Sequence, residues 1–144
     1  AVGRLRPDMI IHLGDCWADA EQLHRKFPMT VMEQVPGNCD CRQEVQERIL
    51  LIEGKKILIC HGHTFNVKAG YLNLEYAAEE RKVDAALFGH THRVFYGKHN
   101  RITYMNPGSI GQPPYGIPPS YGVLQVDGSS NTIATDVIYL EENN

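Results

Sequence analysis

The chain has 144 residues, of which 42% are hydrophobic and 22% charged, and its formal net charge is −3. These values are typical of one soluble globular domain, so we treat residues 1–144 as a single domain. Lysine and arginine are scattered along the chain, which argues against a surface for bulk nucleic acid. No apolar run approaches the ~20 residues that span a bilayer and no signal peptide is visible, so we expect a cytoplasmic protein without a membrane partner.

The first half of the chain predicts strands that alternate with a helix. Residues 9–13 are an apolar, β-rich run between turn residues and predict a largely buried strand. Residues 18–27 predict a helix that ends at Pro28, with four side chains on one face: Ala20, Leu23, His24 and Phe27. A second strand is predicted over residues 30–35, closed by a Pro-Gly pair.

The second half of the chain predicts mainly hairpins. Three pairs of apolar runs flank glycine-containing connections: 48–52 with 56–60, 94–96 with 102–105, and 121–126 with 132–140. A helix over 71–81, with Leu72, Leu74 and Tyr76 in its pattern, and a strand over 85–88 separate the first pair from the second. This order of elements predicts an α/β fold of mixed sheets in α/β/β/α layers.

Four short polar clusters follow predicted strands. They are Gly14-Asp15, Gly37-Asn38-Cys39-Asp40, His61-Gly62-His63 and Gly89-His90-Thr91-His92. Ligand sites of α/β sheets form beyond the carboxyl ends of the strands, so these loops can converge on one crevice. Each cluster alone has an ordinary explanation as a turn, a cap or a surface histidine. Those explanations do not account for all four clusters together.

The donors in these clusters indicate a divalent metal site. Imidazole, carboxylate and amide oxygen suit ions such as Mn, Fe, Ni, Co or Zn. The four cysteines do not indicate a structural zinc site, because Cys39-x-Cys41 lacks zinc-ribbon spacing and Cys16 and Cys60 have no partner motif.

The ordered clusters, with the later Asn106-Pro107-Gly108-Ser109, resemble the calcineurin-like metallophosphoesterases, especially the small bacterial YfcE-like branch. The resemblance covers essentially the whole chain. It implies hydrolysis of phosphoesters, foremost phosphodiesters, by a hydroxide that bridges two divalent ions, with Mn as the foremost metal. It also implies that Asp15 bridges the ions, that Asn38, His61 and His90 complete one of them, and that His92 serves the other.

The family's first motif, Asp-x-His at the end of its first strand, has no counterpart among the residues before Asp15. We therefore expect a domain that lacks its first strand and helix, as a shortened chain would. The opening Ala-Val-Gly-Arg-Leu has the character of the end of a helix. A natural variant with one impaired metal position, or a first strand that is present elsewhere but unresolved, would also explain the missing motif.

The general acid is open to two interpretations. Many relatives follow the motif's asparagine with a histidine, whereas this chain has Cys39 there. A thiol with an ordinary pKa of ~8.5 is a poor general acid, so modest catalysis on substrates with good leaving groups is expected. His63 is the other candidate acid, with a supporting role beside His61 as the alternative.

Two further hypotheses for function stay open. One is a binding scaffold that keeps the fold without turnover, and the other is a mononuclear metal hydrolase that uses Asn38, His61 and His90 with Asp15. The loop 111–119 is rich in Pro and Gly, and it suits a substrate pocket, a contact in a homo-oligomer or ordinary loop packing. The expected partner is a small phosphoester.

Overall fold

The computed structural model describes residues 1–40 and 45–141, so Cys41 lies outside the described part. The elements in chain order are α1 Val2–Leu5, β1 Met9–His12, α2 Trp17–Lys26, β2 Val31–Gln34, β3 Glu47–Ile52, β4 Lys55–Cys60, the 3-10 turn η1 His63–Phe65, α3 Leu72–Glu80, β5 Ala85–Leu87, β6 Val94–His99, β7 Ile102–Pro107, β8 Ser120–Asp127 and β9 Thr132–Tyr139. The α/β fold of mixed sheets is confirmed.

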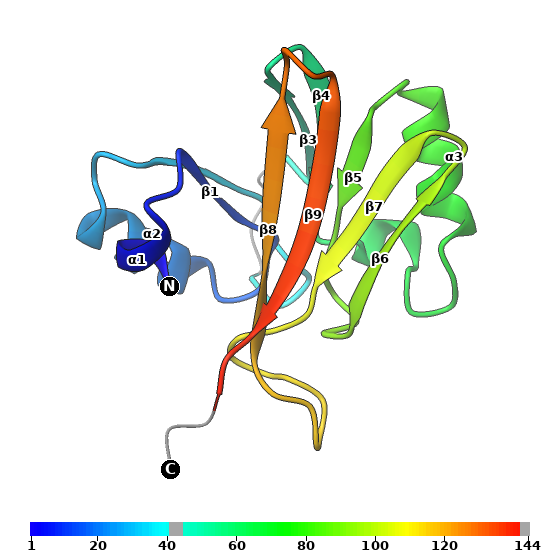
Figure 1. Ribbon diagram of the computed structural model, residues 1–144. Helices are drawn as coiled ribbons and strands as arrows, with labels where there is room; N and C mark the ends of the chain where they lie inside the picture. Colours follow the sequence, from blue (N-terminus) through cyan, green and yellow to red (C-terminus); the bar gives the residue numbers. More distant parts are fainter. Residues whose placement is uncertain (41–44, 142–144) are drawn as a thin grey trace.

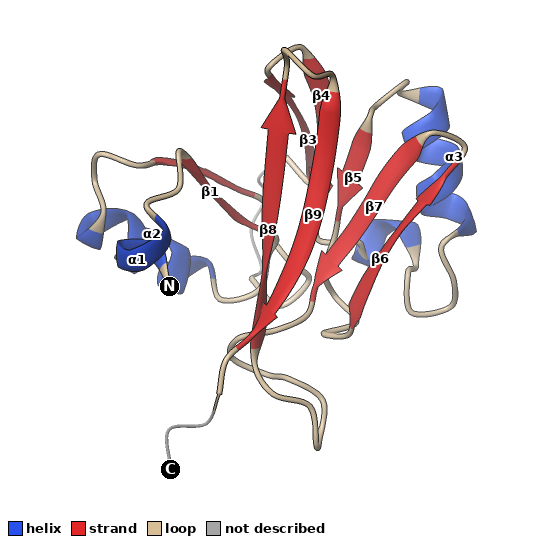
Figure 2. Cartoon of the chain, in the orientation of Figure 1, coloured by secondary structure: helices blue, strands red, loops and turns tan. Residues whose placement is uncertain are grey.

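The largest sheet has five strands in the order β3-β4-β5-β7-β6. Its inner pairs, β4 with β5 and β5 with β7, are parallel, whereas the outer strands β3 and β6 join by antiparallel hairpins. Two smaller sheets, β1-β2 and β8-β9, lie on one side of it. Figures 1 and 2 show α3 on the outer side of the large sheet and α1 and α2 on the far side of the small sheets. This is the predicted α/β/β/α layering.

Apolar side chains cover both faces of the five-stranded sheet. On the side of α3, the core contains Leu58, Phe88 and Tyr104 together with Leu74 from the helix. On the other side, Ile57, Ile59 and Leu87 are among the residues that pack against β1, β8 and β9. Strands β4 and β5 are buried on both faces because helix and sheet sandwich them. The polar loops that follow β4 and β5 therefore begin at well-packed strands.

The N-terminal layer is packed less tightly. All four residues of β1 are half-buried, which corrects the prediction of a largely buried strand. β1 pairs only with β2 among the described strands, so its second edge gains no partner there. The predicted apolar face of α2 is also only partly right, since Ala20 is buried but His24 is exposed near the basic end of the helix.

Other local differences have simple causes. Gly97 and Lys98 belong to β6 rather than to a turn, and the hairpin reverses at Asn100 and Arg101, which both adopt left-handed backbone angles. Leu72 and Tyr76 belong to α3 but face outward, because only part of the helix contacts the sheet.

None of the described helices has the length and apolar character needed to cross a bilayer.

Candidate metal centre

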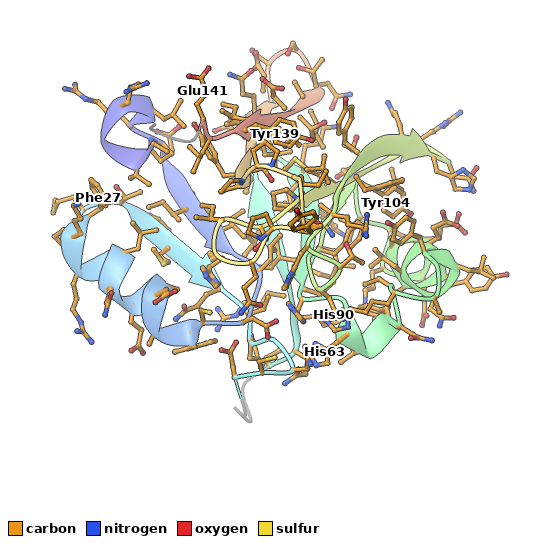
Figure 3. The ribbon with its side chains drawn as sticks, turned by 90° about the horizontal axis from the view of Figure 1, so that it is seen from below. Phe27, His63, His90, Tyr104, Tyr139 and Glu141 are labelled. Carbon is orange, nitrogen blue, oxygen red and sulfur yellow. The ribbon has the colours of Figure 1, made fainter. Side chains whose placement is uncertain are left out.

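The polar loops that follow β1, β2, β4 and β5 meet at one end of the molecule. β1 runs parallel to β2, and β4 runs parallel to β5, so within each pair the carboxyl ends lie together. Figure 3 views the molecule from below, with His63 and His90 labelled side by side at this end.

Asp15 is the centre of the cluster. Its Oδ2 lies 3.2 Å from Nε2 of the buried His61, and its Oδ1 accepts a hydrogen bond of 3.0 Å from the backbone N–H of Cys39. One carboxylate thus contacts the loop after β4 and the loop after β2. The prediction that these distant loops converge is confirmed for Asp15 and His61.

Three imidazole rings stand together beside this carboxylate. The ring centroid of His61 lies 5.1 Å from that of His63 and 4.9 Å from that of His90, and the centroids of His63 and His90 are 6.1 Å apart. Nδ1 of His61 lies 3.0 Å from Nδ1 of His63, so one of these nitrogens donates to the other. His61 therefore contacts Asp15 with one nitrogen and His63 with the other.

The backbone at the site adopts unusual angles. Asp15 and Cys16 have φ of 54° and 63°, and His90 and His92 have φ of 67° and 58°. Such left-handed angles cost non-glycine residues energy, on the order of 1 kcal/mol each, and they cluster where the fold holds functional groups in place. Two of the predicted ligand loops are thus held in strained conformations.

Glycine allows the loops to approach one another. A Cβ on Gly14 would lie 2.8 Å from both the backbone N of Gly37 and Cδ2 of His61. A Cβ on Gly37 would overlap the carboxylate of Asp15. Only residues without a side chain allow the Asp15 loop to lie against the Asn38 loop and His61 at this distance.

Asn106 fixes the loop that carries His90 and His92. Its side chain is fully buried, and its Nδ2 donates to the carbonyl of Gly89 at 3.0 Å and to Oγ1 of Thr91 at 2.9 Å. Its Oδ1 accepts from the backbone N–H of Gly108 at 3.0 Å. The sequence singled out this asparagine as part of a motif but gave no role for it. The structure shows that it orients the histidine loop.

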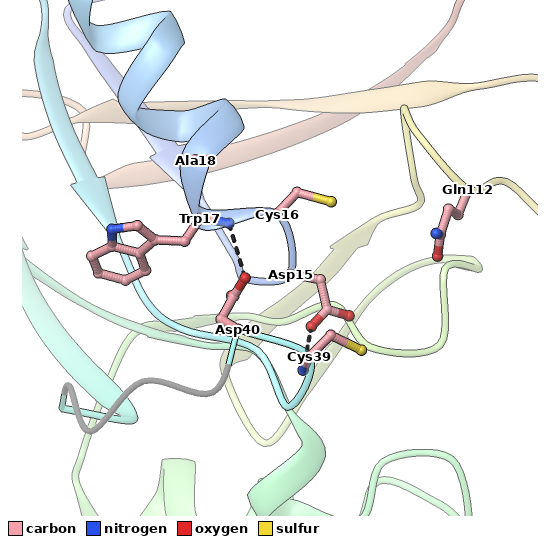
Figure 4. A pocket seen from close by; sticks show the side chains of 7 residues that line it. All are labelled: Asp15, Cys16, Trp17, Ala18, Cys39, Asp40 and Gln112. Carbon is pink, nitrogen blue, oxygen red and sulfur yellow. Dashed lines mark hydrogen bonds between the residues drawn. The ribbon is translucent and has the colours of Figure 1, made fainter.

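A cavity of about 450 Å³ opens beside Asp15. Figure 4 shows its lining residues: Asp15, Cys16, Trp17, Ala18, Cys39, Asp40 and Gln112. The loop 111–119 contributes Gln112 to this lining, and its role as part of a substrate pocket stays a prediction. Trp17 and Gln112 were not predicted, because neither residue type at its position carries a signal for a site.

The sequence of the chain is similar to those of known proteins. Residues 2–129 match the description "calcineurin-like phosphoesterase superfamily domain". The chain belongs to this superfamily. It is 36% identical over 132 residues to the probable metallophosphoesterase YsnB of Bacillus subtilis, and the aligned residues cover 88% of this chain and 73% of YsnB. It is 30% identical over 114 residues to the phosphodiesterase YfcE of Escherichia coli, and here the aligned residues cover 79% of this chain and 50% of YfcE.

Solved structures share the fold of this phosphoesterase. A predicted phosphoesterase from Streptococcus pneumoniae superposes with a TM-score of 0.75 at 22% identity, over 91% of this chain and 88% of that one. Vps29 from Entamoeba histolytica, complexed with zinc, superposes with a TM-score of 0.74 at 20% identity, over 96% and 87% of the two chains. The curated relatives are named metallophosphoesterases and a phosphodiesterase, which identifies the chain as a phosphoesterase of a family that uses divalent metal ions.

The electrostatics of this phosphoesterase keep His61 and His90 neutral. Burial lowers the pKa of His61 to about 4, and the neighbouring His90 and His63 add to that effect against the opposing charge of Asp15. Burial also lowers the pKa of His90, helped by Lys68 and His63. A neutral ring has a lone pair to give to a metal ion, so both rings are in the protonation state of a ligand at neutral pH.

The carboxylate of Asp15 is kept ionised. Burial acts to raise its pKa, but the hydrogen bond from the Cys39 N–H, the electrostatic interaction with the adjacent imidazole of His61 and the side-chain contact with Cys39 together outweigh burial and lower it. The thiol of Cys39 shows the reverse effect, because the negative charge of Asp15 raises its pKa. Asp15 thus provides the negative charge among these donors.

The donor types fit a divalent ion, although the donor atoms contact one another. In residues 1–40 and 45–141, no group of three or more His, Cys, Asp or Glu side chains is arranged to hold an ion. Both ring nitrogens of His61 face protein groups, Asp15 on one side and His63 on the other. Asn38 is exposed and His92 half-buried. Their roles as metal ligands stay predictions, and so do those of Asp15, His61 and His90.

Proposed function

We propose that this phosphoesterase hydrolyses phosphodiesters with two divalent ions, with manganese the foremost candidate, held by Asp15, Asn38, His61, His90 and His92. The observation that carries the proposal is the contact between Asp15 and the neutral His61 beside the ring of His90. These groups come from loops after three different strands. A purely structural cluster has no need of a carboxylate in contact with a buried, neutral imidazole.

The charges of the chain's own donors favour an anionic substrate. Asp15 supplies one negative charge, whereas asparagine and neutral histidines supply none. When bound, divalent ions supply Lewis acidity and positive charge that one carboxylate does not neutralise. A phosphodiester is the substrate class that matches such a site, and the cavity beside Asp15 gives it room.

His63 is the proposed general acid. Its Nδ1 is engaged with His61, which orients the ring and directs the other ring nitrogen away from His61. His63 is half-buried and next to His90, so a leaving-group oxygen in the site can approach it. Cys39 is the weaker candidate, because the charge of Asp15 raises the pKa of its thiol and so lowers its acidity.

The test uses bis-p-nitrophenyl phosphate with added Mn²⁺. We expect His90→Ala to lower kcat/KM at least about a hundredfold, because the loss of a metal ligand costs several kcal/mol of transition-state stabilisation. His99→Ala is the matched control, since His99 is exposed at the end of β6. Equal activity of His90→Ala and His99→Ala, or full activity with excess chelator, would rule out the proposal.

Titration calorimetry with Mn²⁺ separates the two-metal mechanism from its alternatives. Two ions per folded chain, with turnover, support the proposal. One ion with turnover supports a mononuclear hydrolase. A folded chain that binds metal without turnover supports a binding scaffold of the same fold.

We also propose a cytoplasmic location, where thiols stay reduced. Cys16, Cys39 and Cys60 are free in the described part of the chain, and two of them are exposed. Disulfide-linked protein recovered from cells under non-reducing conditions would contradict this location.

A further inference from the structure

Asp40 joins the two loops that carry the proposed carboxylate and amide ligands. Its Oδ1 accepts a hydrogen bond of 2.9 Å from the backbone N–H of Trp17, two residues after Asp15. Its Oδ2 accepts one of 2.8 Å from the N–H of Gly37, the residue before Asn38. Figure 4 shows the bond to Trp17 running between the loops. Both oxygens of one side chain are thus used on backbone groups of the site.

The contact with Trp17 supplies a missing cap. Trp17 is the first residue of α2, and Cys16 at the N-cap position makes no side-chain hydrogen bond to the helix. The first N–H groups of a helix lack partners within the helix, and its positive end favours a carboxylate. Asp40 therefore caps α2 from a loop that lies 23 residues further along the chain.

The contact with Gly37 closes the loop of Asp40 on itself. The backbone N–H of Asp40 also donates to the carbonyl of Gly37 at 3.2 Å, so side chain and backbone together make a turn over residues 37–40. Within this turn the N–H of Cys39 points at Asp15 and makes the 3.0 Å hydrogen bond. The shape of the turn and the position of the Asp15 carboxylate are therefore linked.

The backbone just before Trp17 is strained and needs contacts such as that of Asp40 to hold it. Asp15 and Cys16 have successive left-handed φ of 54° and 63°, and such strained backbone persists only where surrounding contacts hold it. The segment ends at Trp17, the residue that Asp40 holds.

We propose that Asp40 is a positioning residue that sets the distance between Asp15 and Asn38 for metal binding. This inference rests on the proposed function. A carboxylate offers an acceptor oxygen to both N–H groups, whereas an asparagine would turn an NH₂ group toward one of them. Asp40 does not itself contact the metal in this proposal.

The test compares Asp40→Asn with Asp127→Asn. Asp127 also accepts backbone N–H groups, from Ser129 and Ser130 in the β8–β9 hairpin, and lies outside the site. We expect Asp40→Asn to raise the Kd for Mn²⁺ by about 10- to 100-fold, the usual effect of losing a residue that orients ligands. We expect Asp127→Asn to leave this Kd unchanged, and Asp40→Glu to recover part of the affinity.

A second measurement is made on metal-free protein by NMR. If Asp40 positions the loops, Asp40→Asn shifts the side-chain carboxyl signal of Asp15, which accepts the hydrogen bond from Cys39 and lies far from Asp40 in the sequence, whereas Asp127→Asn does not. If Asp40→Asn does not fold, Asp40→Glu is measured in the same way, and a weaker Kd with a shifted Asp15 signal is expected from its longer side chain. A folded Asp40 variant with the wild-type Kd and Asp15 signal would overturn the inference. The absence of Mn²⁺ binding by the wild type would refute the proposed function instead, and the Asp15 signal would still decide the role of Asp40.

Discussion

The two halves of the candidate site differ in how deeply the strands that support them are buried. His61, His63 and His90 emerge from β4 and β5, which are buried on both faces, and the fully buried Asn106 fixes the loop of His90. Asp15 and Asn38 emerge from β1 and β2, whose residues are half-buried or exposed. The imidazoles are therefore held by well-packed strands, whereas the carboxylate and the amide depend on a few specific contacts for their position.

The largest effect should come from the core of the half that holds the imidazoles. Phe88→Ala removes a fully buried ring from the core between the large sheet and α3, so we expect a loss of about 3–5 kcal/mol in the free energy of unfolding. Ile11→Ala, in the half-buried β1, should cost clearly less. Urea denaturation measures both losses in the free energy of unfolding. Equal losses would contradict the conclusion that the strands behind the histidines are better packed than β1.

Asn106→Ala should have the next largest effect. It removes one hydrogen bond each from the Gly89 carbonyl, the Thr91 hydroxyl and the Gly108 N–H, beside a side chain that is itself fully buried, which costs about 1–3 kcal/mol. Because these contacts orient the loop of His90, phosphodiesterase activity of the folded variant should fall as well. Asn100→Ala is the control, since its amide contacts Glu79 at the surface. A stable Asn106 variant with full activity would show that the histidine loop needs no such support.

The pH dependence of stability should reveal the buried imidazole. The pKa of His61 is about 4 in the folded chain and about 6.5 when unfolded. Between these values the unfolded chain binds more protons, so metal-free protein should lose stability as the pH falls from about 6.5 toward 4, with no effect above that range. Unfolding of chelator-treated protein at pH 7 and pH 5 measures this loss. His61→Gln should reduce the dependence and His99→Gln should leave it unchanged; a wild type equally stable at both pH values contradicts the assignment.

The smallest effect should come from an ion pair between the halves. Arg48 of β3 lies 3.1 Å from Glu33 of β2, with both side chains partly exposed. Exposed pairs contribute about 0–1 kcal/mol and weaken with salt. Arg48→Gln should therefore lower the melting temperature only slightly, and the difference should shrink in 1 M NaCl. A large loss would mean that this pair, rather than the site contacts, holds the N-terminal layer.

The sequence predicted most strands, both long helices and the convergence of the polar loops, because strand ends and turn residues are local signals. It did not predict that β1 is only half-buried, since burial depends on which strands become neighbours. It also gave no role for Asp40 or Asn106. Their hydrogen bonds reach backbone groups up to 23 residues away, and such contacts leave no periodic pattern in the chain.

The central claim is that Asp15, His61 and His90 share a metal ion, and histidine-detected NMR with Mn²⁺ tests it most directly. A paramagnetic ion broadens the ring signals of the nearest residues. We predict that the first additions of Mn²⁺ broaden the signals of His61, His63 and His90, while those of the exposed His24 and His99 stay sharp. Broadening of His24 and His99 to the same extent, or none at the three site rings, would contradict the account.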